Sequence, residues 1–189
     1  FSQKKEMIFY VEGKNQVALK TPQTVMHIER DSKIDGFTLS PKEDFLATYG
    51  WSGSVELWDV LTGECLHALN HTETVSTVTF SDDGKYLAVG TLGMGGAGAI
   101  RSIYIWNVHK GSLWCTLNGH NHQVHALAFG PKNDWLVSAS LDRTVRVWRL
   151  DHDTPSDSSE ISRLKYEDLE FHNIAVLSDG RLIVFRRNM

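Results

Sequence analysis

Three tryptophans close three similar stretches of the chain, and their spacing limits the possible folds more than any other feature. Trp58, Trp106 and Trp148 each end a short run rich in β-branched and apolar residues, a pattern that predicts a β-strand. Trp148 follows Phe129 by 19 residues, and Trp58 follows Leu39 by the same number. The chain therefore repeats one structural unit, and the fold must accommodate several copies of it.

The clearest copy of the unit lies between residues 117 and 150. It contains three runs of strand length separated by turn residues: Val124 to Phe129, Trp135 to Ser140 and Val145 to Leu150. These runs predict a small antiparallel sheet, which cannot bury both of its faces without neighbouring sheets. Trp106 and Trp148 are 42 residues apart. This spacing, with four short strands per unit, is typical of a β-propeller blade.

Specific motifs occur at matching positions of these units. Trp58-Asp59 and Gly119-His120 are two of them, and Ser140-Leu141-Asp142-Arg143-Thr144 forms the turn before the strand that ends at Trp148. On these motifs the chain resembles the WD-repeat β-propeller family, closely over residues 34–150 and more loosely in the flanks. Two of the three units depart from the family at the residue after the tryptophan.

The resemblance implies an all-β fold, a β-propeller of four-stranded antiparallel blades with about four and a half WD-type repeats. We expect a partial blade at 1–33, three blades at 34–70, 71–118 and 119–170, and the start of a further blade at 171–189. Family members usually close their ring with more blades, so we expect an incomplete ring. The chain is then part of a longer polypeptide, or a partner chain supplies blades. A closed four-bladed ring and a larger oligomeric ring are the alternatives.

Blades of this family contain a buried polar network of a His, a Ser or Thr, an Asp and the Trp. The resemblance assigns these roles to His120, Ser138, Asp142 and Trp148. Such a network is physically reasonable, because a buried imidazole and a buried indole N–H need hydrogen-bond partners, and a carboxylate can orient the imidazole.

The other two tryptophan-closed units have only part of this network. At or near the same positions, the unit that ends at Trp58 has Arg30, Thr48 and Ser52. The unit that ends at Trp106 has His71 and Val89 at these positions, and no Asp. We therefore expect a complete network only in the unit that ends at Trp148, and mainly apolar packing in the others.

Two arrangements raise the question of catalysis or metal binding. His120, His122 and His125 are closely spaced, but no Cys or carboxylate cluster accompanies them, so we expect no metal and no cofactor. Ser138, Asp142 and His120 superficially match a catalytic triad. Because the resemblance gives these three residues buried structural roles, we expect no enzyme activity.

Charge and composition disfavour several further classes. The formal net charge is −4 and no stripe of Lys and Arg is present, which argues against a nucleic-acid partner. No apolar run has the length of a membrane span and no signal-peptide pattern opens the sequence, so we expect no membrane partner. Cys65 and Cys115 are too few for a disulfide framework, which favours a reducing compartment. The resemblance implies a cytoplasmic or nuclear location.

Loops on one face of such a disc are the expected place for protein partners to bind. The candidate contact residues on that face are Trp51, Met94, Arg101, His122 and Arg143. Trp51 lies in a tight turn, where its ring packs either on a neighbouring blade or on a partner. The glycine-rich stretch 92–101 joins two predicted strands, which favours a turn or a partner contact over phosphate binding.

The composition changes after Leu150. Residues 151–160 are polar and acidic and predict a connecting loop, which offers Ser156, Ser158 and Ser159 as possible phosphorylation sites. Residues 163–169 follow as a weak fourth strand of the same blade.

The sequence therefore favours a non-catalytic scaffold that presents loop residues to protein partners, which include further blades in the same or another chain. Two alternatives remain. One is a regulatory or sensor propeller within a larger signalling NTPase or ubiquitin-ligase assembly. The other is a propeller that binds nucleic acid, which the acidic charge balance disfavours.

Overall fold

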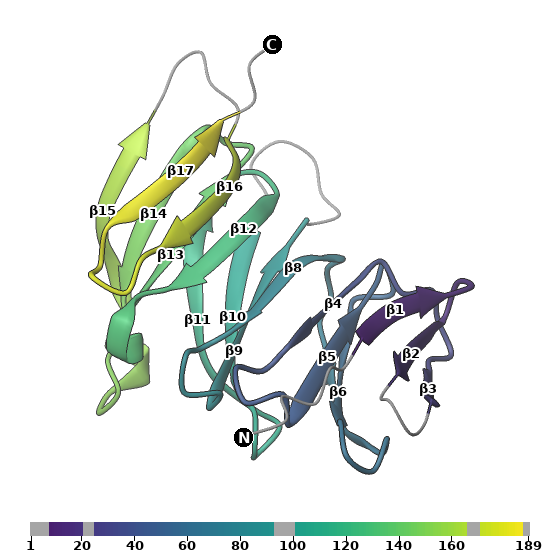
Figure 1. Cartoon of the computed structure of the whole chain (residues 1–189). Helices are drawn as coiled ribbons and strands as arrows, with labels where there is room; N and C mark the ends of the chain where they lie inside the picture. Colours follow the sequence, from purple (N-terminus) through teal and green to yellow (C-terminus); the bar gives the residue numbers. More distant parts are fainter. Residues whose placement is uncertain (1–7, 21–24, 93–100, 166–170, 187–189) are drawn as a thin grey trace.

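The fold is a row of antiparallel β-sheets, seen in a computed structural model that describes residues 8–20, 25–92, 101–165 and 171–186 (Figure 1). The sheets follow one another in chain order, and each strand pairs with its neighbour in the sequence. The predicted all-β fold with four-stranded antiparallel blades is confirmed. No helix among the described residues is long and apolar enough to cross a membrane.

The first sheet consists of β1 (Ile8–Glu12), β2 (Gln16–Lys20) and β3 (Val25–Glu29). The second consists of β4 (Gly36–Leu39), β5 (Phe45–Tyr49), β6 (Ser54–Asp59) and β7 (Cys65–Asn70). The third consists of β8 (Val75–Phe80), β9 (Tyr86–Thr91), β10 (Arg101–Asn107) and β11 (Ser112–His120). The fourth consists of β12 (Val124–Phe129), β13 (Trp135–Ser140), β14 (Thr144–Arg149) and β15 (Ser159–Lys165). The fifth consists of β16 (Phe171–Val176) and β17 (Leu182–Arg186).

The inner sheets bury both of their faces. Successive side chains of a strand point to opposite faces, so one strand serves two interfaces. On β13, Leu136 belongs to the apolar layer shared with the third sheet, and Val137 belongs to the layer shared with the fifth. On β9, Leu87 packs toward the second sheet and Ala88 toward the fourth. This double burial explains why the middle strands of the predicted units are almost continuously apolar.

Each tryptophan that closes a unit faces the sheet before it. Trp58 lies in the layer between the first and second sheets, and Trp148 lies in the layer between the third and fourth. Trp106 packs against the layer between the second and third sheets. The regular spacing of the tryptophans therefore corresponds to one bulky side chain in each successive interface.

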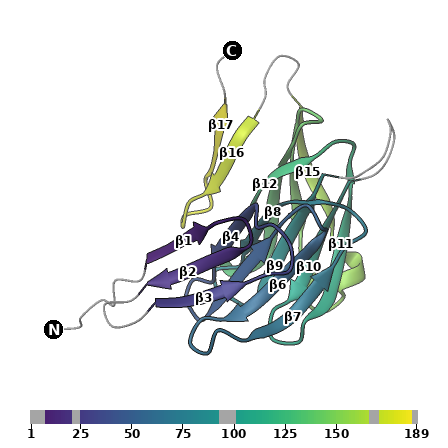
Figure 2. The same ribbon diagram turned by 90° about the vertical axis from the view of Figure 1, so that its right-hand side faces the viewer.

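The row of sheets is curved but not closed. Figure 1 shows the first sheet and the fifth sheet at opposite ends of the row, and in Figure 2 β16 and β17 stand as a separate pair above the first sheet. The strands at the inner side are β4, β8, β12 and β16, and neighbours in this series contact one another. The incomplete ring expected from the sequence is thus what the structure shows.

Two details differ from the expected boundaries. Arg101 pairs with His120, so backbone pairing places His120 at the end of β11 in the third sheet rather than at the start of the fourth unit. The fourth strand of the last complete sheet begins at Ser159, earlier than the predicted 163, because Ser159 pairs with Arg149 and Glu160 with Trp148. The acidic connector is correspondingly shorter and contains a 3-10 turn, η2 (Pro155–Asp157).

The layers between sheets should carry most of the stability. Leu136 is fully buried between the third and fourth sheets, and we expect Leu136→Ala to lower the free energy of unfolding by about 3 kcal/mol through lost burial and a residual cavity. Leu61→Ala is a matched control, because Leu61 is 84% exposed in the turn after β6 and should change stability by less than about 0.5 kcal/mol. Chemical denaturation measures both, and equal losses would contradict the double-burial account.

Candidate interaction site on the loop face

The sheets end in two sets of loops, and one set gathers most of the predicted site residues. This set consists of the connectors 30–35, 71–74 and 121–123 and the turns 50–53 and 141–143; we call it the loop face. Loops at the end of the same sheet are hydrogen-bonded to each other. The His71 N–H donates to the Gly53 carbonyl, and the Leu141 N–H donates to the Gln123 carbonyl.

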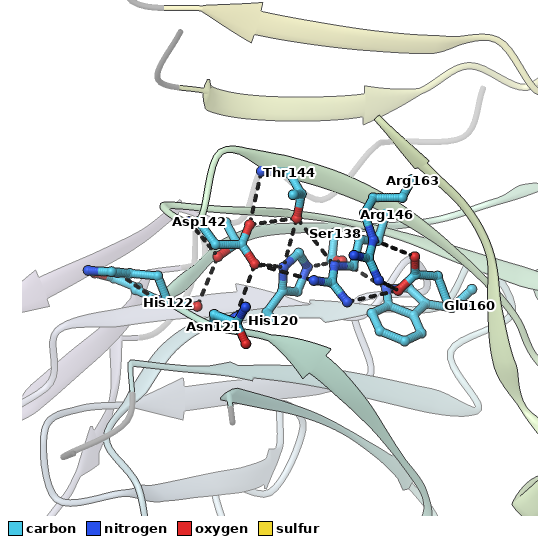
Figure 3. Close-up of polar contacts among 12 residues, drawn as sticks. His120, Asn121, His122, Ser138, Asp142, Thr144, Arg146, Glu160 and Arg163 are labelled. Atoms are coloured by element: carbon cyan, nitrogen blue, oxygen red, sulfur yellow. Dashed lines mark hydrogen bonds and ion pairs between the residues drawn. The ribbon is translucent and has the colours of Figure 1, made fainter. Parts of the chain in front are cut away.

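The fourth sheet contains a continuous hydrogen-bonded network at its loop-face end (Figure 3). The Trp148 indole N–H donates to Ser138 Oγ at 2.8 Å, and Ser138 Oγ lies 2.7 Å from His120 Nε2. His120 Nδ1 lies 2.8 Å from Asp142 Oδ2. The structure thus brings together the four residues named from the family resemblance, and His120 reaches them from the third sheet.

The direction of each bond in this network follows from the chemistry of its ends. A carboxylate only accepts, so His120 carries its proton on Nδ1 and donates it to Asp142. The Nε2 atom is then an acceptor, and the Ser138 hydroxyl donates to it while accepting from the Trp148 indole. The serine hydroxyl and both imidazole nitrogens are therefore occupied by internal partners, which is the condition for burying such groups cheaply.

The network extends beyond the four residues expected from the sequence. The Thr144 hydroxyl donates to Asp142, and Arg146 Nε donates to Thr144 Oγ1 at 3.2 Å. Arg146 Nη1 then bonds Glu160 on β15 at 2.8 Å, and Glu160 also pairs with Arg163. A sign of this extension was present in the sequence, because Arg146 interrupts an otherwise apolar strand.

The interface between the second and third sheets uses a shorter network. Val89 stands where β13 has its serine, so the Trp106 indole N–H donates directly to His71 Nε2 at 3.0 Å. The other imidazole nitrogen, Nδ1, therefore carries the proton and donates to the Gly53 carbonyl at 2.9 Å. The Tyr104 ring lies 4.9 Å from the imidazole and completes its enclosure.

The interface between the first and second sheets uses an arginine in place of the histidine. Arg30 is buried, and its Nε lies 3.0 Å from Glu56 Oε2 while its Nη2 donates to the Ser54 carbonyl. The Trp58 indole N–H donates to Thr48 Oγ1 at 2.9 Å. Three successive interfaces therefore each contain one basic side chain, from Arg30, His71 or His120, that extends from the earlier sheet toward the later one.

Burial shifts the titration of both network histidines. Burial lowers the pKa of His120, although the neighbouring Asp142 carboxylate acts in the opposite direction, and burial likewise lowers the pKa of His71. Burial alone would raise the pKa of Asp142, but hydrogen bonds from His120 and Thr144 hold it well below its usual range. At neutral pH the network thus consists of a neutral imidazole bonded to an ionised carboxylate.

Trp51 lies on a turn that the surrounding loops fix in place. Its backbone N–H donates to Asp35 Oδ2 at 3.0 Å, and its carbonyl accepts from Thr74 Oγ1. Gly53 has a φ of +77°, and a Cβ there would lie 2.8 Å from the His71 carbonyl oxygen. Despite this fixed backbone, the Trp51 residue is 68% exposed. Its ring therefore does not use a neighbouring sheet as its packing partner.

The other predicted contact residues are placed differently. His122 and Arg143 are exposed on the loop face, in the loop before β12 and the turn before β14. Arg101 must be corrected: it is only 7% exposed because it belongs to β10 and pairs with His120, so it does not present its charge to a partner. Met94 and the glycine-rich residues around it lie outside the described residues.

The candidate metal and phosphorylation residues do not converge on the loop face. His120 is buried in the network, the His122 Nδ1 accepts the Gln123 N–H, and His125 lies on β12. Across residues 8–20, 25–92, 101–165 and 171–186, no group of three His, Cys, Asp or Glu residues is arranged to hold a metal. Ser156, Ser158 and Ser159 lie in and beside the connector between β14 and β15, at the opposite end of the sheets.

Comparison with known proteins accounts for this architecture. The family model "WD domain, G-beta repeat" matches residues 111–149, and the model "Anaphase-promoting complex subunit 4 WD40 domain" matches residues 1–83. The crystal structure of the WD40 β-propeller domain of Doa1 superposes with a TM-score of 0.70 over 97% of this chain, at 16% identity. The chain belongs to the WD-repeat family. It covers 58% of that Doa1 domain.

Curated WD-repeat relatives are longer than the chain. WD repeat and SOCS box-containing protein 1 of Homo sapiens is 30% identical over 117 residues, which cover 61% of this chain and 26% of that protein. Small ribosomal subunit protein RACK1 of Caenorhabditis elegans is 30% identical over 134 residues, which cover 69% of this chain and 36% of that protein. Target of rapamycin complex subunit wat1 of Schizosaccharomyces pombe is 29% identical over 169 residues, which cover 88% of this chain and 49% of that protein. The chain thus spans less than half of each.

Asp142 and Ser52 hold equivalent turn positions in the fourth and second sheets, but we expect their substitution to affect stability very differently. Asp142→Ala should lower the free energy of unfolding by about 3 kcal/mol, because it leaves the buried His120 Nδ1–H without its acceptor and removes a carboxylate that Thr144 and Arg146 also contact. Ser52→Ala is the control, since Ser52 holds the same position in the second sheet but is exposed, and it should cost less than about 0.5 kcal/mol. Denaturant titration tests both; similar losses would mean that Asp142 is not central to the interface.

The lowered histidine pKa values predict acid sensitivity. Between the folded pKa values and the ordinary value of 6.5, the unfolded chain binds more protons at His71 and His120 than the folded chain does. Stability should therefore be complete above pH 6.5 and fall as the pH decreases, by at most about 1.4 kcal/mol per pH unit for each histidine. His71→Gln should flatten the slope of unfolding free energy between pH 5 and 7. His122→Gln, at an exposed position, should leave it unchanged.

Proposed function

We propose that this chain is a non-catalytic interaction scaffold that binds a protein partner on its loop face, with Trp51 as the central anchor. The observation that carries the proposal is the exposure of Trp51, 68%, on a turn whose backbone is fixed by Asp35 and Thr74. A rigid, exposed tryptophan loses little conformational entropy on binding and offers a large apolar area. Because the ring is exposed, it contributes much less to the stability of the fold than it could contribute to binding.

The surroundings of Trp51 favour protein recognition. Lys33 pairs with Asp35, whose carboxylate accepts the Trp51 backbone N–H, and His122 and Arg143 are exposed farther along the same face. A ring of polar residues around an apolar anchor is the usual arrangement of a protein-binding patch. The loop face therefore offers both an anchor and a polar rim.

The polar network supports the non-catalytic part of the proposal. Ser138, His120 and Asp142 have the side chains of a hydrolase triad, but the Ser138 hydroxyl donates to His120 and accepts from Trp148. His120 and Ser138 are fully buried, so a substrate has no approach to the hydroxyl. These residues are best explained as links between two sheets.

The relatives support a role within a larger protein or assembly. They include a SOCS box-containing protein and a target of rapamycin complex subunit, and the chain spans only 26% and 49% of those two proteins. We infer that the propeller acts as one part of such a larger unit in the cytoplasm or nucleus. The partner's identity is to be found by experiment at the loop face.

A site-specific cross-linking experiment tests the proposal. A photoreactive residue at position 52, beside Trp51 on the same turn, should capture discrete protein partners, whereas the same residue at position 61, in a turn at the opposite end of the sheets, should not. Trp51→Ala should reduce recovery of the captured partner by about tenfold or more, the effect of removing a binding hot spot. Its melting temperature should stay close to that of the unaltered protein, because the ring is exposed. A large loss of stability with unchanged capture would sink the proposal.

A further inference from the structure

The connection between β14 and β15 is longer than its counterparts. Residues 60–64 join β6 to β7 and residues 108–111 join β10 to β11, whereas residues 150–158 join β14 to β15. The extra length contains η2 and turns back toward the third sheet, where η2 contacts β11. We call residues 151–158 the strap.

The strap covers aromatic side chains of the third sheet. The His152 imidazole lies 5.3 Å from the Trp114 ring and 5.6 Å from the Tyr86 ring. His152 Nε2 also lies 3.1 Å from the Asn133 carbonyl oxygen. The ring contacts therefore hold the strap against the third sheet, and the hydrogen bond holds it to the turn between β12 and β13 of its own sheet.

Ser158 is the closing point of the strap. Its Oγ accepts the Asp151 backbone N–H at 3.0 Å, which joins the two ends of the loop. The same hydroxyl lies near the Cys115 thiol of β11, whose pKa it lowers slightly against the effect of burial. Cys115 is only 8% exposed, and its burial raises the thiol pKa to about 11. Ser158 thus joins the two ends of the strap at a point beside the third sheet.

The neighbouring serines lack this role. Ser156 is exposed on η2, and its hydroxyl lies 3.4 Å from the Asp157 carboxylate. Ser159 is exposed at the start of β15, where its backbone pairs with Arg149. A modification of either would leave the Ser158 contacts in place.

We propose that Ser158 is a phosphorylation site and that its phosphorylation releases the strap from the third sheet. In the reaction the Ser158 oxygen attacks the γ-phosphorus of ATP, the hydroxyl proton passes to a base of the kinase, and ADP leaves. The sequence around it, Asp157-Ser158-Ser159-Glu160, suits a kinase with a basic substrate groove. The inference does not depend on the proposed function of the loop face.

The charges around Ser158 favour release over a tighter contact. Four carboxylates belong to the strap or its ends: Asp151, Asp153, Asp157 and Glu160. The guanidinium groups of Arg146 and Arg163 are already paired with Glu160. A phosphate of nearly two negative charges at Ser158 would repel these carboxylates and would not fit beside the buried Cys115. Arg149, which lies 3.9 Å from Asp151, is the cation that could oppose this effect.

Release would change the surface at the end of the sheets opposite Trp51. Tyr86 and Trp114 would lose the cover of His152, and Cys115 would become accessible to solvent. A kinase can bind the segment only when the strap is detached, so the strap must already detach part of the time. Phosphorylation would then stabilise this detached conformation. The result is an aromatic patch whose exposure depends on modification.

Thiol labelling provides the first test, because the chain contains its own reference. Cys65 is exposed and Cys115 is buried, so the labelling rate of Cys115 relative to Cys65 reports opening of the strap. Ser158→Glu should accelerate the labelling of Cys115 by about tenfold through like-charge repulsion, and Ser158 bearing phosphate should do so more strongly. Ser156→Glu adds the same charge two residues away and should leave the rate unchanged.

Two further measurements keep the test decisive. Ser158→Ala separates loss of the hydroxyl from gain of charge and should give a smaller acceleration than Ser158→Glu. A melting temperature measured for each variant excludes general unfolding, which would also alter labelling. Slower labelling of Cys115 in the phosphorylated protein would overturn the proposal and would indicate that Arg149 pairs with the phosphate. Equal acceleration by Ser156→Glu would overturn it as well.

Phosphorylation itself is tested by incubating the folded chain with ATP and an acidic-directed serine kinase. Mass spectrometry should locate the phosphate on Ser158, and Ser158→Ala should abolish most of its incorporation. Phosphate found only on Ser156 or Ser159 would contradict the assignment of Ser158.

Discussion

The structure depends on one constraint: a four-stranded sheet with two apolar faces is stable only between two other sheets. Leu136 and Val137 are neighbours in the sequence, yet each is buried against a different sheet. Burial of this kind supplies the main favourable free energy of folding. Each sheet therefore depends on both neighbours, which makes the row of sheets, and not the single repeat, the unit that folds.

Apolar layers alone do not fix the position of one sheet on the next, because apolar contacts have little directional preference. The basic side chains at the loop-face end provide direction. Arg30, His71 and His120 each extend from one sheet to polar atoms on the next, through an ion pair, a direct indole contact and a longer network. Because Arg30 and His120 are buried and His71 is half-buried, an incorrect alignment would leave these groups unpaired at a cost of several kcal/mol. Different residues thus solve the same problem in successive interfaces.

The same arrangement separates stability from recognition. The network side chains are buried at the loop-face end, which fixes the loops, while Trp51 on a neighbouring turn projects outward. At the other end of the sheets, the strap contacts the third sheet through the His152, Trp114 and Tyr86 rings and is closed by Ser158, so its proposed release would leave the buried apolar layers in place. A rigid centre with separately attached loops allows binding and modification to occur without loss of the fold.

The sequence by itself determined the repeat, the strands and the family, because alternating burial and the tryptophan spacing are local and periodic properties. It also named His120, Ser138, Asp142 and Trp148, whose motif positions are fixed within one repeat. Only the tertiary structure decided which groups those residues reach across an interface: the extension through Arg146 to Glu160, the exposure of Trp51 and the burial of Arg101. These outcomes depend on contacts between sheets, where side chains distant in sequence compete for the same partners and the same space.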